Sequence, residues 1–476
     1  MRMVAKIVKW FAIVVVVVVG GAAGWLYVFP PELIRVGAAY SAKIACSNVF
    51  LAGRDAAEVL ADDVQAPGHP ILKYIELKKF GEDGFSASLF GILARETPIH
   101  RDGLGCTVVA DHDPDAVRAV RFAVPPAVAA KSDYEWPMGD QVSLAPNSRV
   151  TTLLADELLT GPGMRAVVVV KNGKIVGETY AKGFTSETPL LGWSMTKTVT
   201  GALVAARVAE GKLKWDQDKL FAEWTDDRAG IKVSDLMAMQ SGLNLEETYG
   251  DVNDVTRMLF LEPDQAKFVA AHGMEAAPGG KFEYTTGSAV LLTKLWMSTF
   301  TDRQDALSYP RKALFGPIGM RSAVLETDEA GTFSGGSLMY ATGRDWARFG
   351  LLLANGGDWN GVQVLPTDFA RMVGAATPLS EGRYTEGLAW KEGPQEQPNG
   401  KFGLPADTFW AQGHDGQSIA IIPSEKLVVV RMGLTPQKLG YGPEALVAKI
   451  VDAAKEMPGD EGMAPEIGIE TSPEPE

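Results

Sequence analysis

Cysteine and excess positive charge are both scarce in this chain of 476 residues. It has 2 cysteines, and its 45 basic residues are outnumbered by 59 acidic ones, which leaves a net charge of −14. The basic residues are scattered rather than gathered in a stripe, which excludes a nucleic-acid binder. The sequence also has no P-loop, no G-x-G-x-x-G and no H-E-x-x-H segment, so we expect no nucleotide, flavin or metal cofactor.

The two cysteines, Cys46 and Cys106, both follow the apolar N-terminal segment. They do not indicate a metal site. In an exported protein a lone pair is most simply explained as one disulfide, and two buried free thiols are the alternative. On the chain-entropy estimate, closing a loop of this size would stabilise the fold by about 4 kcal/mol.

The first thirty residues differ in composition from the rest. Three basic residues, Arg2, Lys6 and Lys9, precede an uncharged run. This run, from Trp10 to Pro31, is long enough to cross about 30 Å of hydrocarbon as a helix. The preceding charges predict a single-pass anchor in the cell membrane, with a cytoplasmic N-terminus and the rest of the chain on the periplasmic or extracellular side. A cleaved signal peptide is the alternative, but "WLYVF" continues the run past the small residues "GGAAG", which favours the anchor.

Changes in composition divide the chain into four parts. Residues 1–31 form the cytoplasmic stub and anchor. Residues 32–148, called here the accessory region, lack strong periodicity; they would cap a cleft or brace the main domain against the membrane. Their acidic "DHDPD" lacks the glycine and terminal glutamate of a calcium loop, so a turn capping a helix is preferred to a cation site. Residues 149–456 form the main domain, and the acidic, proline-rich residues 457–476 are predicted to be disordered.

The main domain has strands at both ends and helices between them. "RAVVVVKNGKIVGETYAKGF" is a hairpin with an Asn-Gly turn, and "HDGQSIAIIPSEKLVVVRMG" gives two more strands. "TGRDWARFGLLLANGG" is a helix that Thr342 caps, and a last helix starts at Pro443. This order predicts an α+β fold (an α/β sandwich), with an antiparallel sheet built from both ends of the domain, flanking helices and a helical lobe. A cleft between the sheet and the lobe is the expected site for a small molecule.

"GWSMTKTVTG" places Ser194 and Lys197 three positions apart at a helix start, on one face. A serine hydroxyl becomes a nucleophile when a neighbour takes its proton, and a lysine of lowered pKa can do this. A capping serine followed by a solvated lysine is the alternative. A nucleophile elbow is disfavoured because position 196 is threonine rather than glycine.

Two further segments accompany this motif. In order and approximate spacing, "SMTK", "PGGKFEYTTGSAVLLTKL" and "QGHDGQSIAIIPS" resemble the three motifs of the serine β-lactamase and penicillin-binding protein superfamily. The resemblance covers about residues 150–455 and is closest to the class C-like branch, which includes esterases and 6-aminohexanoate-dimer hydrolases. It implies that Ser194 is the acylated nucleophile, Lys197 its activating partner, and Tyr284 the group that moves protons to the leaving group. A packed aromatic is the alternative for Tyr284.

The third motif implies further site residues. His414 stands where the family has lysine or histidine, and Gly416 would let substrate approach the strand. The backbone amide of Gln417 is expected to pair with that of Ser194 as the oxyanion hole. A structural role is the alternative for His414. Trp193 would line the acyl pocket or merely pack.

Two positions depart from the family pattern. Thr286 stands where many relatives have asparagine, and His414 replaces the lysine that binds a substrate carboxylate. Both changes argue against an efficient β-lactamase and favour an esterase or amidase that acts on a small-molecule or short-peptide substrate. A D,D-peptidase acting on cell-wall peptides and a non-catalytic binding relative are the alternatives. The sequence does not indicate an oligomeric state.

Overall fold

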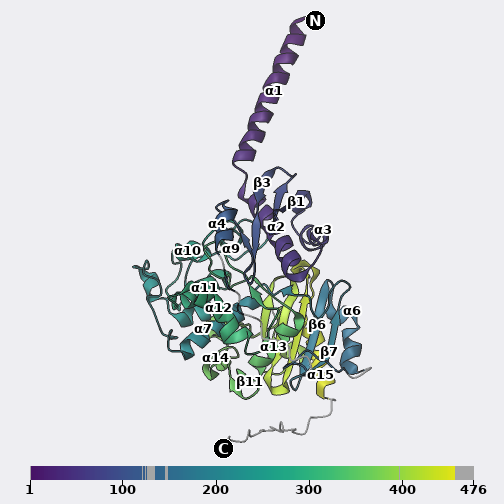
Figure 1. The fold of residues 1–476 in the computed structure, drawn as a ribbon, viewed down its shortest axis with the longest axis vertical. Coiled ribbons are helices and arrows are strands. Elements are labelled where there is room, and N and C mark those ends of the chain that lie inside the picture. The colour runs from purple at the N-terminus through teal and green to yellow at the C-terminus, as the bar shows by residue number, and fades with distance from the viewer. Residues whose placement is uncertain are drawn as a thin grey trace, which may run out of the picture.

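The computed structural model describes residues 2–120, 122–123, 125, 134–144, 148–395 and 397–455. The predicted disordered tail, residues 457–476, lies outside the described residues. Helix α1 (Arg2–Val28) projects away from the rest of the molecule, and the accessory region lies between α1 and the main domain (Figure 1). Within α1, Lys6–Val28 is long and apolar enough to cross a membrane and is not buried.

The main sheet has five antiparallel strands in the order β13-β14-β15-β6-β7. The strands are β6 (Met164–Lys171), β7 (Lys174–Tyr180), β13 (Phe409–Gly413), β14 (Gln417–Ile422) and β15 (Leu427–Gly433). The turn between β6 and β7 is Asn172-Gly173, and both residues have positive φ, as a two-residue hairpin turn requires. The antiparallel sheet from both ends of the domain is therefore confirmed.

Consecutive valines of β6 pack into two different cores. Val168 lies in the large core on the side of helix α13 (Gly343–Ala354), whereas Val167 and Val169 pack with the closing helix α15 (Glu444–Lys455). Successive side chains of a strand point to opposite faces, so a continuous valine run indicates a strand covered on both sides. Two short helices, α5 (Arg149–Leu154) and α6 (Glu157–Thr160), lie on the α15 side.

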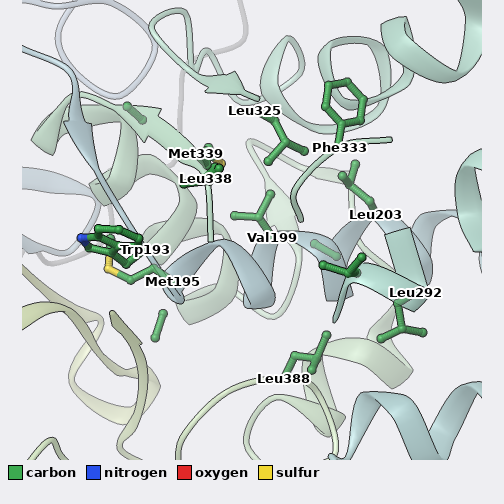
Figure 2. Packing of buried hydrophobic residues seen from close by; sticks show 14 of the residues in the cluster. Trp193, Met195, Val199, Leu203, Leu292, Leu325, Phe333, Leu338, Met339 and Leu388 are labelled. Atoms are coloured by element: carbon green, nitrogen blue, oxygen red, sulfur yellow. The ribbon is translucent and has the colours of Figure 1, made fainter. Parts of the chain in front are cut away.

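The helical lobe comes from the middle of the main domain. Its helices are α7 (Met195–Ala209), α8 (Val233–Met237), α9 (Asp254–Phe260), α10 (Gln265–Ala270), α11 (Thr286–Ser298), α12 (Arg303–Pro310) and α14 (Thr367–Met372). Short strands accompany them: β8 (Leu190–Leu191), β9 (Val324–Leu325), β10 (Met339–Ala341), β11 (Asp358–Trp359) and β12 (Val362–Gln363). Figure 2 shows Val199 and Leu203 among the buried side chains of the core that surrounds α7. This packing fixes the helix that begins at the SMTK segment.

The accessory region has a long helix, α2, and a second antiparallel sheet, neither of which was predicted from the sequence. Its elements are α2 (Glu32–Ala52), α3 (Ala56–Glu58), β1 (Ile75–Phe80), β2 (Gly84–Leu89), β3 (Leu93–Glu96), β4 (Pro98–Arg101), β5 (Gly105–Val108) and α4 (Pro114–Ala119). The predicted disulfide between Cys46 and Cys106 joins α2 to β5. Asp113 of "DHDPD" accepts a bond from the Ala116 amide and caps α4, which confirms the capping interpretation.

A buried ion pair fastens the accessory region to the main domain. Glu326, which follows β9, pairs with Lys43 of α2, and both side chains are almost completely buried. The same carboxylate accepts bonds from the Ser47 hydroxyl (2.8 Å) and the Cys106 amide (2.7 Å). Because one carboxylate binds both the helix and the disulfide-bearing strand, α2 is held in a single position on the main domain.

Candidate active site

Ser194 and Lys197 meet at the first turn of α7. Ser194 precedes the helix as its N-cap residue, but within the described chain its side chain caps no amide of α7. Instead, the Lys197 Nζ lies 2.8 Å from the Ser194 Oγ. Ser194 is partly exposed and Lys197 is buried. The hydroxyl is therefore accessible to a substrate and in contact with a buried amine.

The Lys197 amine has two further partners. Its Nζ donates to the Thr286 Oγ1 (2.9 Å) and to the Gly336 carbonyl (3.0 Å). Burial lowers the pKa of Lys197 to about 8, against an opposing effect of the Glu247 carboxylate. Desolvation disfavours the charged form of an amine. A useful fraction of Lys197 is therefore neutral near physiological pH and able to accept a proton.

Thr286 connects this amine to a carboxylate. Glu247 accepts a bond from the Thr286 amide (2.8 Å) and a second from its hydroxyl. The Thr286 hydroxyl thus donates to Glu247 and accepts from Lys197. The threonine that departs from the family pattern is, in this chain, a link between the carboxylate and the lysine.

Tyr284 lies over the same amine. The Lys197 Nζ is 4.8 Å from the centre of the Tyr284 ring. Burial and the Glu247 carboxylate raise the pKa of the phenol and outweigh a hydrogen bond with Ser194 that lowers it, so the net pKa lies well above the usual value. The phenol is therefore protonated near neutral pH and able to donate its proton. Tyr384 and Trp390 pack against the ring, with centroids 5.7 Å and 5.1 Å away.

The third motif brings His414 to the mouth of the site. Its ring stacks on Tyr249 (4.8 Å between centroids) and meets the edge of Trp193 (5.7 Å). The His414 Nε2 lies 3.5 Å from the Asp415 Oδ1. His414 is thus a partly exposed member of an aromatic cluster, with a carboxylate close to its ring.

The segment around Gly413 determines which backbone amides face the nucleophile. A Cβ added at Gly413 would lie 2.2 Å from the Gly192 carbonyl and 3.0 Å from the Gln417 Cβ, so only glycine allows this approach. Gln417 lies on β14, one strand in from the edge, and Gly413 separates it from the nucleophile turn. The pairing of the Gln417 amide with the Ser194 amide stays a prediction, and the amide directly after Gly413 is a second candidate for that role.

Gly416 and Trp193 have unusual backbone conformations. Gly416 has a φ of +82°, and a Cβ there would lie 2.8 Å from a guanidinium nitrogen of Arg431. Packing over this buried arginine accounts for the glycine without a substrate. Trp193, directly before the nucleophile, has a φ of +47°. A bulky residue in this region is strained, which indicates that the surrounding packing holds the turn that presents Ser194.

Trp193 and His414 also line a pocket of about 310 Å³, which we call the accessory-side pocket. Tyr249 and Phe260 of the helical lobe line it as well. Its remaining apolar wall comes from the accessory region: Leu33, Val36, Pro67, Ile71 and Leu72. The pocket next to the nucleophile is thus bounded jointly by the accessory region and the main domain.

Sequence reasoning missed Glu247, Tyr249, Tyr384 and the Gly336 carbonyl. None belongs to one of the three motifs. The stretch "NLEETYGDV" carries two of them, but its spacing gives no sign of an active site. No group of three or more potential metal ligands occurs among the residues that the structure describes.

Comparison with known proteins agrees with this geometry. The model of the Beta-lactamase family matches residues 154–447. A 6-aminohexanoate-dimer hydrolase from Paenarthrobacter ureafaciens is 22% identical over 352 residues, which cover 69% of this chain and 86% of that protein.

Two solved structures share the fold. A putative 6-aminohexanoate-dimer hydrolase from Bacillus anthracis has a TM-score of 0.55 and 22% identity, covering 66% of this chain and 86% of that one. A family VIII carboxylesterase has a TM-score of 0.50 and 16% identity, covering 66% and 98%. Because the family model matches more than half of the chain and includes the three motifs, the chain belongs to the Beta-lactamase family of serine hydrolases.

Proposed function

We propose that this protein hydrolyses an ester or amide through an acyl-enzyme on Ser194. The observation that carries the proposal is the 2.8 Å contact between the Ser194 Oγ and the Lys197 Nζ, together with the lowered pKa of that buried amine. A serine next to a partly neutral amine meets the requirement for an activated nucleophile.

Acylation would proceed through three proton transfers. Neutral Lys197 takes the proton of the Ser194 hydroxyl as the Oγ bonds to the substrate carbonyl carbon. The oxyanion is held by the Ser194 amide and by the amide that follows Gly413. Tyr284 then gives its proton to the leaving oxygen or nitrogen as that bond breaks, and regains one from the Lys197 ammonium. Water reverses these steps in deacylation.

The third motif bears on the choice of substrate. His414 stacks on Tyr249 and has the Asp415 carboxylate close to its ring. A substrate carboxylate at this position would face a partly exposed imidazole and a carboxylate instead of a lysine. We therefore favour an ester or amide without a carboxylate at this end over a β-lactam.

We also propose that α1 anchors the enzyme in the cell membrane with the catalytic domain on the outer side. The uncharged run and the preceding basic residues support this orientation. The Cys46–Cys106 disulfide agrees with an oxidising compartment.

The test is covalent labelling with a fluorophosphonate, followed by turnover of p-nitrophenyl acetate. Wild type should label and hydrolyse, Ser194→Ala should do neither, and Lys197→Ala should label about one hundredfold more slowly. Ser424→Ala, in the β14–β15 turn at the opposite end of β14 from Gln417, is the matched control and should behave as wild type. Labelling that survives Ser194→Ala would contradict the proposal. Release of D-alanine from a D-Ala-D-Ala peptide would instead favour the peptidase alternative.

A further inference from the structure

The accessory-side pocket has a wall that the main domain does not supply. Leu33 and Val36 lie in the first two turns of α2, and Ile71 and Leu72 lie in the turn before β1. They face a space that Trp193 and His414 border from the nucleophile side. A volume of about 310 Å³ is at the lower end of the range of small-molecule sites.

This wall is held in place. Lys43, on the same helix as Leu33 and Val36, forms the buried pair with Glu326. The disulfide at Cys46 ties the C-terminal half of α2 to β5. The pocket is therefore formed before any ligand arrives, so binding would not require the accessory region to close over the site.

The pocket is apolar inside, and its charged residues are few. Its charged lining residues are Asp251 and Lys438, which are exposed and carry opposite charges, and Asp415, which lies beside His414. The accessory region supplies aliphatic side chains, and Trp193 and Phe260 add aromatic surface. Such a site favours an uncharged hydrocarbon chain, because each buried methylene adds binding free energy whereas a charge would lose its hydration.

We propose that the accessory-side pocket binds the hydrocarbon chain of the ester or amide, and that the accessory region thereby sets the preference of the enzyme for chain length. This inference rests on the proposed function, because it assigns the part of the substrate that Ser194 does not touch. The pocket borders the residue before the nucleophile, so a chain seated in it would lead to the reacting carbonyl.

The position of the pocket makes lipid-borne substrates accessible as well as dissolved ones. α2 begins at Glu32, shortly after the end of α1 at Val28, and Figure 1 shows the accessory region at the base of α1. At 1.5 Å per residue, Leu33 and Val36 lie within about 6 Å, along the helix, of the start of α2. Both sources present the same chemistry, an ester with a hydrocarbon chain.

The experiment compares kcat/KM for p-nitrophenyl octanoate and p-nitrophenyl acetate, using the full chain in phospholipid vesicles. Wild type should prefer the octanoate by about tenfold or more, since each buried methylene contributes about fourfold. Leu33→Asp and Ile71→Asp should each lower this ratio by about fivefold or more, because each puts a charge into the apolar wall. The carboxylate introduced by Leu33→Asp would stand in the first turn of α2, where it is compatible with the helix N-terminus.

Ile92→Asp is the matched control, because Ile92 is an exposed aliphatic residue of the same region outside this pocket. It should keep the wild-type ratio. An unchanged ratio in both pocket variants, or no preference for octanoate in wild type, would overturn the inference. A second measurement uses a monoacylglycerol carried in the vesicles. If this lipid is hydrolysed and the pocket variants weaken its hydrolysis, the lipid surface is a source of substrate. If only the dissolved ester is hydrolysed, the substrate comes from the aqueous phase.

A binding measurement separates this inference from the proposed function. Octanoic acid amide should bind to Ser194→Ala in vesicles, as measured by calorimetry, and bind about fivefold more weakly when Leu33→Asp is added. If no ester is hydrolysed but this binding difference holds, the pocket assignment stands and the catalytic proposal fails. If esters are hydrolysed but the amide binds both proteins equally, the pocket assignment fails alone.

Discussion

Lys197 is surrounded by hydrogen-bond acceptors yet deprived of water. Its Nζ contacts the Ser194 Oγ, the Thr286 Oγ1 and the Gly336 carbonyl, so each of the three ammonium protons has an acceptor. Burial lowers the pKa of Lys197 to about 8, and the Glu247 carboxylate opposes part of this shift. A lysine in this position can be protonated at rest and still lose its proton at modest cost.

The pH dependence of acylation follows from that pKa. Because the neutral amine is the base, kcat/KM should rise about tenfold per pH unit below a pH of about 8 and level off above it. The Tyr284 phenol adds no limb in this range, since its pKa is raised far above it. The measurement is kcat/KM for p-nitrophenyl acetate between about pH 5.5 and about pH 9.5, corrected for spontaneous hydrolysis. A profile that is flat across this range would contradict Lys197 as the base.

The charge of Glu247 should shift the pKa of Lys197 without direct contact between the two side chains. Its carboxylate raises the pKa of Lys197, so Glu247→Gln should move the rising limb of the profile to lower pH, by roughly one unit. The glutamine oxygen can still accept from the Thr286 amide, and the Thr286 hydroxyl, which donates to the other carboxylate oxygen of Glu247, can rotate, which limits the structural disturbance. Glu246→Gln, at the exposed neighbouring carboxylate, should leave the limb unchanged. A shift to higher pH in the Glu247 variant would contradict an effect of this carboxylate that raises the pKa of Lys197.

Helix α2 and the loop after β9 form the junction between the accessory region and the main domain. Glu326 is completely buried and binds Lys43, Ser47 and the Cys106 amide. A buried ion pair adds little net stability by itself, but removing one partner leaves an uncompensated charge. The junction is therefore sensitive to changes in a single side chain.

Glu326→Gln should lower the free energy of unfolding by about 3 kcal/mol, because Lys43 then loses its counter-charge. Asp305→Asn breaks the exposed Lys312–Asp305 pair (3.2 Å) and should cost less than about 1 kcal/mol. Urea unfolding followed by tryptophan fluorescence measures both. Adding Lys43→Met to Glu326→Gln should recover part of the loss. Equal effects of the buried and exposed substitutions would show that the Lys43–Glu326 pair is not a fixed contact.

The elements that local sequence determines were predictable. The Asn172-Gly173 turn, the Thr342 cap and the helix after Pro443 all depend on residues within a few positions of one another. The accessory sheet escaped prediction because its strands are short and all six residues of β2 are buried. Such a strand has no alternation of polar and apolar residues by which to identify it.

The candidate site likewise combines residues that local sequence indicates with residues that only the fold brings together. The Ser194–Lys197 pair is set by helical spacing, so the sequence alone indicated it. Glu247 reaches Thr286 across 39 positions, and only the packing of the lobe brings them together. Gln417 was assigned to the oxyanion hole because it follows Gly416 of the third motif, and this assignment stays a prediction. Strand pairing places Gly413 between Gln417 and Gly192, which no local pattern reveals.

The molecule as a whole is arranged in three parts along its long axis. Figure 1 shows α1 at one end, the accessory region at its base and the main domain beyond. Because α2 follows α1 after Phe29, Pro30 and Pro31 only, the connection is too short to let the accessory region move far from the end of α1. The proposed anchor, the accessory region and the main domain therefore occupy successive levels (Figure 1).

The whole-molecule prediction concerns the anchor. The full chain should sediment with membranes after a carbonate wash, and its intact mass should include residues 1–31. Val15→Lys combined with Val18→Lys should release it, because each lysine near the centre of the span costs about 3 kcal/mol. Leu158→Lys, at a 90% exposed position of the main domain, should sediment as wild type. A mature protein that lacks the first residues and remains in the wash would establish a cleaved signal peptide, and the enzyme would then meet its substrates free of the bilayer.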